Sequence, residues 1–469
     1  KGLGATVIAG AVNLSSLIEF KVTAIGSKTR LSQIIRLMEE IQEGNAKTQK
    51  LVDRISSIFI PVVLIVALGS FLFWVLLSNQ GFTQGVLRMI SVLVIACPCS
   101  LGLATPTAIM VGTGIAARKG ILFKSVTALE LGNSIKSIVF DKTGTLSFGK
   151  PSISDIVTTN LEKSRFSSNK LERHLLKVAA SVGYGSEHPL ATAIVDEANQ
   201  RGINIIEVEN FCSVPGLGAT CNCEKDVWRI GNSNFMLNNK VDLASLEPQK
   251  NRLEQEGKST VWVSCNKEAI GLIAVFDKIR TEARSVVKTL QKKGLKVLMM
   301  SGDHQVAVAS VARDLGISEY KSHLTPEKKA AEILELQLSG SIVAMAGDGI
   351  NDAPGLAQAD LGIALGSGAD LATQTADIII MGNKLDLIPL SLAISERTIR
   401  TIRQNISWAF LYNLILIPTA AGALYNLESL PHFIRGLHPA MAALAMAFSS
   451  ISVVLNSLRQ KYFFKNNHK

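Results

Sequence analysis

The sequence predicts a multi-pass α-helical membrane protein that carries a large insert of α/β character. Three observations predict this class. The mean hydropathy of the 469-residue chain is positive, +0.28. Four apolar stretches are each long enough to cross a bilayer of about 30 Å, which takes roughly 20 helical residues. Residues 116–405, between the second and third stretches, alternate between strand-like and helix-like patterns, as a folded domain does.

The membrane spans are predicted at about 57–77, 87–115, 406–425 and 437–457. The second one contains "VIACPCSLGLATPTAIM" (94–110); it is overlong, and Pro98 and Pro106 are expected to break it. Basic residues flank the inner ends of these spans, namely Arg118, Lys119, Lys124, Arg397, Arg400, Arg403, Arg459 and Lys461. By the positive-inside rule, the insert and the C-terminus are expected in the cytoplasm and the short loops outside, with the cell (inner) membrane as the location.

Charge and cysteine content narrow the functional classes. The net charge is +10, but the basic residues flank apolar runs and do not form stripes with aromatic residues, so no nucleic-acid partner is predicted. The six cysteines lack the spacing of a secreted disulfide scaffold, which favours a reducing compartment. The chain begins without Met and inside a strand-like pattern, so we expect it to be a piece of a longer protein.

The insert repeats one arrangement, a buried-strand pattern that ends in an acid. It occurs in "SIKSIVFDKTGTL" (134–146), "LKVLMMSGD" (295–303) and "SIVAMAGDGIND" (341–352). Functional sites of parallel α/β sheets gather at the carboxyl ends of the strands. We therefore expect one crevice to hold the four acids that follow these strands, Asp141, Asp303, Asp348 and Asp352.

The segment "DKTGTL" carries the clearest chemical signal. An aspartate at the end of a strand suits a carboxylate nucleophile that accepts a phosphoryl group, and the backbone amides of the following turn can hold phosphate oxygens. A magnesium ion shared between Asp141 and Asp348 would offset the charge of a loose transition state, and Lys329 would add a further cation. A single aspartate at this position is more often a helix cap, but the ordered repeats favour the catalytic interpretation.

These motifs, with "TPEKK" and "GDGINDAP", resemble those of the P-type ATPases, pumps that phosphorylate an aspartate from ATP. The resemblance implies a HAD-like, Rossmann-like phosphorylation domain interrupted by an inserted α+β nucleotide-binding domain. It implies these catalytic residues: Asp141, Lys142, Thr143, Asp303, Lys329, Asp348, Asn351 and Asp352. Of these, Asp141, Thr143 and Asp348 would bind magnesium.

Three further motifs resemble the heavy-metal branch of the same family. They are "SEHPLA" (186–191), "PGLGAT" (215–220) and "IGN" (230–232), and they imply an ATP site. In that branch Glu187 and His188 would orient the adenine. Glycines expose backbone N–H groups without a Cβ, so the nucleotide is also expected near Gly216, Gly218, Gly231 and Asn232.

The pair Cys97 and Cys99 around Pro98 resembles the transport-site motif of the heavy-metal pumps. Thiolate and thioether ligands favour Cu(I) over hard ions. The later spans resemble the copper(I) subgroup through Tyr412, Asn413, Met446 and Ser449, which would complete the copper site. The same ligands leave Ag(I) open, and Zn(II) or Cd(II) remains an alternative cargo. The implied partners are copper, ATP, the lipid bilayer and a copper chaperone as donor.

The resemblance predicts six segments in order. These are 1–50, the end of an actuator domain and a connecting helix; 51–125, two membrane helices; 126–149 and 273–390, the two parts of the phosphorylation domain; 150–272, the nucleotide-binding domain; and 391–469, two membrane helices and a basic tail. The actuator loop Thr-Gly-Glu of the family does not occur in the sequence, so it is expected upstream. A catalytically incomplete remnant and a soluble phosphohydrolase are the alternatives.

Overall fold

The computed structural model describes residues 21–22, 47–78, 81–159, 168–185, 189–206, 208–214, 217–223, 226–348, 352–366, 375–382, 384–426, 429, 431, 435 and 437–466. The chain divides into two compact units. One, the helical unit, lies within Lys1–Ser134, Asp377–Gly382 and Leu387–Lys469, and the other, the α/β unit, comprises Ile135–Ala376 and Asn383–Asp386. Most of the predicted actuator segment 1–50 lies outside the described residues.

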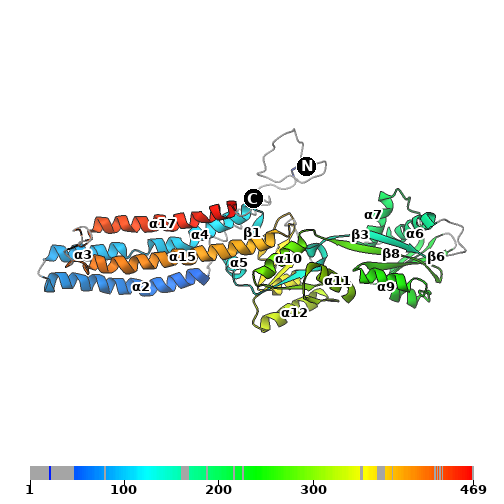
Figure 1. Cartoon of the computed structure of the whole chain (residues 1–469), viewed down its shortest axis with the longest axis horizontal. Helices are drawn as coiled ribbons and strands as arrows, with labels where there is room; N and C mark the ends of the chain where they lie inside the picture. The colour runs from blue at the N-terminus through cyan, green and yellow to red at the C-terminus, as the bar shows by residue number, and fades with distance from the viewer. Residues whose placement is uncertain are drawn as a thin grey trace. The chain divides into compact units, whose positions relative to one another are not determined.

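The helical unit is built from long helices that run side by side (Figure 1). They are α2 (Lys47–Leu72), α3 (Phe82–Ile95), α4 (Cys99–Arg118), α15 (Leu387–Ala421) and α17 (Pro439–Asn466). A short helix, α5 (Val126–Gly132), and an antiparallel pair of strands, β1 (Ile121–Phe123) and β13 (Ile378–Ile380), also belong to this unit.

Three helical segments of the described chain are long and apolar enough to cross a membrane, Arg54–Leu77, Phe82–Arg118 and Pro439–Phe464. The expectation of four is wrong by this measure: the span predicted at 406–425 lies only in part within a helix, because α15 ends at Ala421. The polar side chains Asn405 and Asn413 of α15 are both buried. Polar residues in a membrane helix generally face other helices and not lipid, which agrees with their burial.

The predicted break at Pro98 is confirmed. Helix α3 ends at Ile95 and α4 begins at Cys99, with Pro98 as its N-cap residue. Proline has no N–H to continue the hydrogen-bond ladder, so the helix stops there. The expected break at Pro106 is wrong, because α4 continues through it; membrane helices tolerate proline where neighbouring groups satisfy the freed backbone.

The α/β unit contains a parallel sheet with the order β12-β11-β2-β9-β10. Its strands are β2 (Ser137–Asp141), β9 (Lys296–Met300), β10 (Glu319–Lys321), β11 (Val343–Gly347) and β12 (Leu361–Leu365). Every residue of β2, β11 and β12 is buried, as expected for a parallel sheet covered on both faces. The associated helices are α10 (Ala283–Lys292), α11 (Gln305–Leu315), α12 (Pro326–Leu338) and α13 (Ala353–Gln358).

A second, antiparallel sheet has the order β3-β8-β7-β6-β5-β4. Its strands are β3 (Ser147–Thr158), β4 (Glu209–Val214), β5 (Gly218–Cys223), β6 (Asp226–Gly231), β7 (Ser259–Cys265) and β8 (Glu268–Ile279). Strand β3 begins before residue 150 and β8 ends after residue 272, so the sheet is larger than the segment predicted for it. The domain boundaries stay a prediction.

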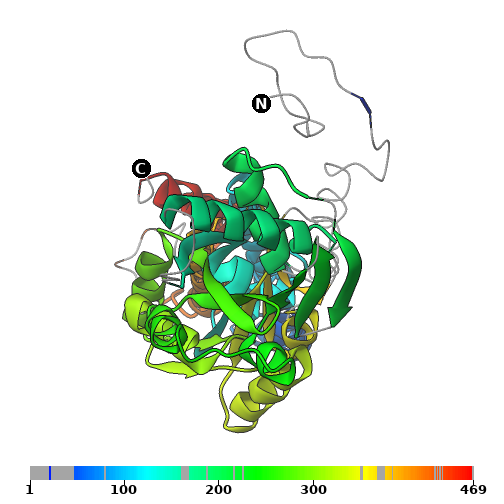
Figure 2. The same cartoon turned by 90° about the vertical axis from the view of Figure 1, so that its right-hand side faces the viewer.

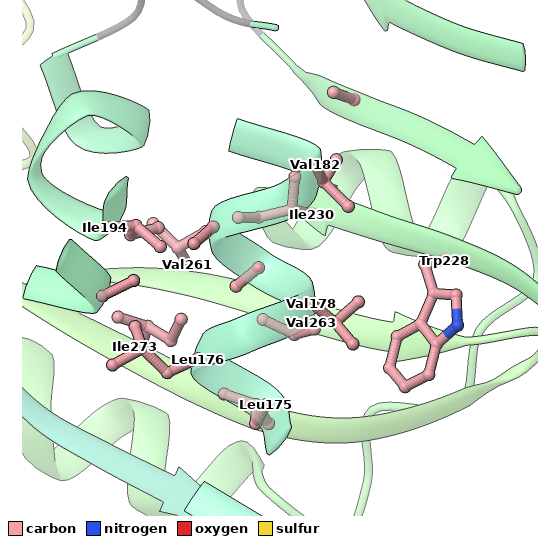
Figure 3. Close-up of a cluster of buried hydrophobic side chains, with 14 of the residues drawn as sticks. Leu175, Leu176, Val178, Val182, Ile194, Trp228, Ile230, Val261, Val263 and Ile273 are labelled. Carbon is pink, nitrogen blue, oxygen red and sulfur yellow. The ribbon is translucent and has the colours of Figure 1, made fainter. Parts of the chain in front are cut away.

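Two helices, α6 (Ser168–Gly183) and α7 (Pro189–Gln200), cover one face of this sheet (Figure 1 and Figure 2). Leu175, Leu176 and Val178 of α6 pack against Trp228 and Val263 of the strands in one apolar core (Figure 3). Short helices α8 (Ser233–Asn238) and α9 (Glu247–Gln255) belong to the same sheet domain, and a second core there contains Phe235 and Trp262.

Candidate functional site

Three carboxylates meet at the carboxyl end of the parallel sheet. Asp141 is the last residue of β2, and Asp348 directly follows β11, the neighbouring strand. Asp352 precedes α13. One oxygen from each of the three groups lies within 4.8 Å of the others, so the predicted meeting of these acids is observed.

A buried lysine lies between two of these carboxylates. Lys329 of α12 places its Nζ 2.5 Å from Asp141 Oδ1 and 2.8 Å from Asp352 Oδ1. The helix starts at Pro326 with Thr325 as its N-cap, whose hydroxyl accepts the Lys328 N–H. Burial disfavours the charged lysine, but the two carboxylates prevail and raise the pKa of Lys329. Lys329 is thus held as a cation against the proposed nucleophile.

The single positive charge of Lys329 does not neutralise the three carboxylates. Burial, followed by the charge of Asp352, raises the pKa of Asp141 to about 7, and the same two causes raise the pKa of Asp348 to about 6. Converging carboxylates with raised pKa values are short of positive charge. Carboxylate oxygens are the ligands that Mg²⁺ prefers, so the residues fit a magnesium ion at Asp141 and Asp348.

Asp303 takes a different position from the other three acids. It follows β9, as predicted, but its carboxylate forms an ion pair with Lys142 and accepts a hydrogen bond from Ser301 Oγ at 3.2 Å. Asp303 is absent from the carboxylate cluster of the described chain. Asp303 therefore holds the lysine next to the nucleophile, outside the group of three carboxylates, and its place in one crevice with them stays a prediction.

The turn after Asp141 depends on a glycine. Thr143 has extended backbone angles (φ −75°, ψ 124°) and an exposed side chain, while Gly144 has φ +74°. A Cβ at Gly144 would overlap the Asp348 carboxylate. Only glycine meets both conditions, the positive φ and the close approach. The role of Thr143 as a magnesium ligand stays a prediction.

Arg280 is a site residue that the sequence did not reveal. It lies directly after β8 and is 5% exposed. Its Nη2 donates to the Gly144 carbonyl at 2.8 Å, its Nε donates to the Ser147 carbonyl at 2.9 Å, and its guanidinium stacks on Phe148. Close by, the Ser147 hydroxyl donates to Asp277. The only sequence signal was the charged "DKIR" at the end of an apolar strand.

The nucleotide motifs are partly described. Glu187, His188, Gly216 and Asn351 lie outside the described residues. Gly218 of β5 and Gly231 of β6 are directly opposed in register, and a Cβ on either would overlap the backbone of the other strand's end. Asn232 caps α8, since its Oδ1 accepts the Phe235 N–H at 2.9 Å. Strand packing and capping therefore account for these three residues independently of a ligand.

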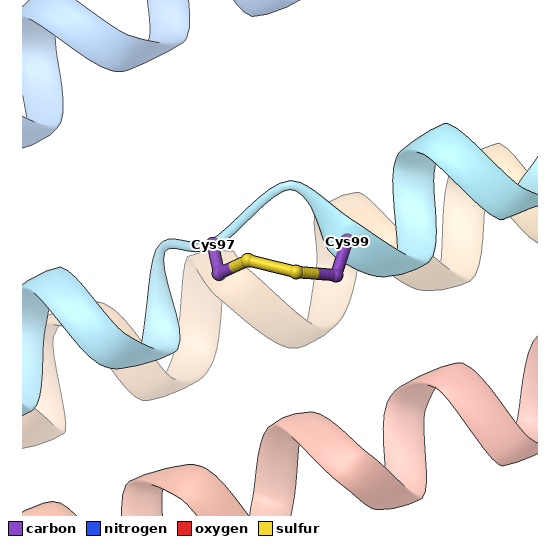
Figure 4. Close-up of a disulfide and its surroundings, with 2 residues drawn as sticks. All are labelled: Cys97 and Cys99. Atoms are coloured by element: carbon purple, nitrogen blue, oxygen red, sulfur yellow. A yellow bond between two sulfur atoms is a disulfide. The ribbon is translucent and has the colours of Figure 1, made fainter.

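The two cysteines of the helix break are joined as a disulfide (Figure 4). Cys97 lies in the break and Cys99 opens α4, so one turn of chain presents both sulfurs. Metals bind the thiolate form, so this oxidised pair would have to be reduced before it could hold copper. Its role as a metal site stays a prediction.

The other predicted copper ligands lie on α15 and α17, which both pack against α4. Asn413 and Ser449 are buried. The Tyr412 hydroxyl is buried and has no hydrogen-bond partner in the described part of the chain, while Met446 is half-buried. The helices that carry these residues are thus neighbours of α4, and the ligand set stays a prediction.

Comparisons with known proteins agree with this arrangement. The family model for the haloacid dehalogenase-like hydrolases matches residues 135–360. The probable copper-transporting ATPase PacS of Synechocystis sp. is 40% identical over 99% of this chain and 61% of its own length. The copper-exporting P-type ATPase of Bacillus subtilis is 42% identical over 98% of this chain and 55% of its own length. The chain thus spans between half and two thirds of these relatives.

A solved structure matches most of the chain. It is the crystal structure of a zinc-transporting PIB-type ATPase in the E2.Pi state, with a TM-score of 0.73, 32% sequence identity, and coverage of 94% of this chain and 68% of that one. The shared fold includes a carboxylate-bearing α/β unit and long apolar helices, which a soluble phosphohydrolase would lack. The chain belongs to the PIB-type ATPases, a branch of the P-type ATPases.

Proposed function

We propose that this chain performs ATP-driven export of Cu(I) across a membrane, through an aspartyl phosphate (an acyl phosphate) formed on Asp141. One observation carries the proposal: Asp141 is buried at the end of β2, 2.5 Å from Lys329 Nζ, with oxygens of Asp348 and Asp352 within 4.8 Å. A carboxylate held in this way is positioned as a nucleophile. Lys329, and a magnesium ion bound by the neighbouring carboxylates, would stabilise the negative charge of the phosphate.

The phosphorylation step transfers the γ-phosphoryl group of ATP to a carboxylate oxygen of Asp141. An oxygen of Asp141 attacks the γ-phosphorus, the bond from that phosphorus to the β–γ bridging oxygen breaks, and ADP departs with the bond's electron pair. Lys329 stabilises the carboxylate before attack, and Lys142, held by Asp303, adds positive charge beside the turn. Magnesium held by Asp141, Asp348 and Thr143 would neutralise charge on the transferred group.

The nucleotide would be bound by the antiparallel-sheet domain. Support comes from the motif residues Glu187, His188, Gly216, Gly218, Gly231 and Asn232, which the heavy-metal branch uses around the adenine. The paired glycines Gly218 and Gly231 allow the ends of β5 and β6 to approach each other closely. These strand ends are where we place the base of ATP.

Copper would bind at the helix break between α3 and α4. In their reduced form Cys97 and Cys99 supply two soft ligands, and Tyr412, Asn413, Met446 and Ser449 on the neighbouring helices would complete the site. Phosphate on Asp141 and copper on the cysteines would each bias one conformational equilibrium, which is how the two sites would be coupled. We place the α/β unit in the cytoplasm and the helices in the cell (inner) membrane, with a copper chaperone as donor.

Zn(II), Cd(II) or Ag(I) is the alternative cargo, and the likeness to a zinc-transporting structure favours testing zinc. Zinc carries two charges and usually binds a carboxylate or an imidazole. Residues 404–421 of α15 and 439–457 of α17 contain no Asp, Glu or His. This absence of hard ligands supports a monovalent soft ion over zinc.

The test is transfer of radiolabelled phosphate from ATP to the chain. Labelling is measured with Cu(I) under reducing conditions, with Cu(I) plus a chelator, and with Ag(I) or Zn(II) in its place. We expect labelling that requires Cu(I) and is lost in Asp141→Asn. Labelling that depends on zinc and not on copper would identify zinc as the transported ion. Labelling that persists in Asp141→Asn would overturn the assignment of the nucleophile.

A further inference from the structure

Two exposed histidines face each other beside the phosphorylation site. His304 follows Asp303 and precedes α11, and His323 lies between β10 and α12. Their ring centroids are 5.0 Å apart, with the ring planes at 77°. Within the described residues, neither imidazole makes a hydrogen bond or an ion pair. The nitrogens of both rings can therefore bind a ligand.

We propose that His304 and His323 together bind a divalent transition-metal ion of the zinc class. An imidazole nitrogen lies about 2.0–2.1 Å from such an ion, and the tetrahedral angle then puts two ligating rings about 5 Å apart, centroid to centroid. The observed separation of 5.0 Å agrees with this spacing. Imidazole suits zinc and similar ions and does not attract Mg²⁺, which prefers oxygen.

Backbone hydrogen bonds join the two segments that carry the histidines. The His323 N–H donates to the Asp303 carbonyl at 3.0 Å, and the Ser301 N–H donates to the Lys321 carbonyl at 3.0 Å, so the two segments are tied to each other. His323 has a φ of +55°, a conformation uncommon for a residue other than glycine. The two ligands are thus preorganised, which lowers the entropy cost of binding.

The position of the pair gives metal binding a consequence for catalysis, and this part rests on the proposed function. Asp303, adjacent in sequence to His304 and hydrogen-bonded through its carbonyl to His323, forms the ion pair with Lys142. A dication at the histidines would attract the Asp303 carboxylate and weaken its hold on Lys142. We therefore assign the histidine pair an inhibitory role, in which zinc slows phosphorylation of Asp141.

Binding is tested first, on the full chain in detergent with Cys97→Ser and Cys99→Ser to remove the membrane thiols. Zinc is titrated against a fluorescent zinc indicator in excess Mg²⁺. The variants are His304→Gln and His323→Asn; asparagine is chosen because it tolerates positive φ. The control is His174→Gln, an exposed histidine whose ring contacts Trp228 on the antiparallel sheet. Equal melting temperatures establish that the variants are folded.

We expect the parent chain to bind one zinc ion. The affinity for this ion should be about tenfold or more lower in both variants and unchanged in the control. X-ray absorption at the zinc edge is expected to show two imidazole ligands in the parent chain. Equal zinc affinity in the parent and both variants would overturn the site.

Inhibition is tested on the chain with native cysteines, as labelling of Asp141 from ATP with and without zinc. We expect zinc to lower labelling in the parent and to have little effect in His323→Asn. Equal inhibition in that variant would overturn the regulatory role. If no form of the chain is labelled, the proposed pump function fails, while the binding titration still decides the metal site.

Discussion

At the level of single residues, the crowded carboxylates should lower the stability of the fold. Burial and Asp352 raise the pKa of Asp141 from its ordinary 3.8 to about 7. A carboxyl whose pKa rises on folding binds its proton more tightly in the folded state, so its ionisation lowers the free energy of unfolding. This cost is absent below pH 4 and is complete above pH 7.

Asp141→Asn should therefore stabilise the protein. The amide removes one buried charge, and Lys329 keeps its bond to Asp352. We expect the melting temperature in the absence of Mg²⁺ to rise by about 2–4 °C at pH 8, corresponding to about 1 kcal/mol, and the gain to shrink at pH 5. Thermal unfolding at the two pH values measures this. A gain of the same size at both would contradict the electrostatic cause.

Arg280 gives a second residue-scale prediction. Its planar guanidinium serves the carbonyls of Gly144 and Ser147 at once, which the single ammonium of lysine cannot do. We expect Arg280→Lys to cost about 1–3 kcal/mol in unfolding free energy and to reduce labelling of Asp141, because the turn loses its support. Arg284→Lys, at an exposed position of α10, is the matched control and should change neither quantity. Normal labelling in Arg280→Lys would remove the positioning role.

The residues that sequence located correctly are those fixed by strand order. Asp141 and Asp348 directly follow adjacent parallel strands, so their meeting required only the topology. Asp303 stands three residues beyond β9, which is enough chain for its side chain to take another partner. Arg280 could not be predicted, because its acceptors are backbone carbonyls and the sequence shows no pattern for them.

At the level of elements, helix α15 shows why polar residues in a membrane segment are ambiguous. Asn405 and Tyr412 are both polar residues of this helix, yet their surroundings differ. Asn405 Nδ2 donates to the Ala104 carbonyl of α4 at 3.1 Å and to Ser457 Oγ of α17 at 3.0 Å, and its Oδ1 accepts from Asn456 at 2.8 Å. Asn405 is fully engaged as a contact between helices, whereas the Tyr412 hydroxyl has no partner among the described residues.

Asn405→Leu tests this junction of α4, α15 and α17. The substitution leaves Asn456 without an acceptor for its 2.8 Å bond and removes both donors to the neighbouring helices, so we expect a loss of about 1–2 kcal/mol, at the upper end for such bonds in membranes. Gln404→Leu is the control, because its exposed side chain makes only a 3.4 Å contact with Asn456. Unfolding in detergent measures both variants. Equal losses would mean that general polarity, and not this junction, sets the stability of the bundle.

At the level of the whole molecule, the two units carry different halves of the proposed function. The helical unit contains Cys97 and Cys99, and the α/β unit contains Asp141. Sequence predicted this division well, since apolar helices and strand-then-acid repeats occupy separate stretches. The limits of the nucleotide-binding segment were less predictable. The paired strands β3 and β8 cross these limits, and the composition of the sequence does not change there.

If one conformational equilibrium couples the units, the coupling must be reciprocal. Copper that promotes phosphorylation of Asp141 requires that a phosphate mimic at Asp141 change the affinity of the cysteines for Cu(I) by the same factor, typically 5–150-fold. Copper affinity, measured by competition with a chromogenic chelator in the reduced chain, should therefore change by that factor when a beryllium fluoride complex and Mg²⁺ are added. Asp141→Asn, which cannot accept the mimic in the same way, should keep one affinity throughout. Cys97→Ser with Cys99→Ser should bind copper weakly in both conditions. An affinity in the parent chain that ignores the mimic would show that the two sites work independently, since no equilibrium that both ligands bias could leave either one unaffected.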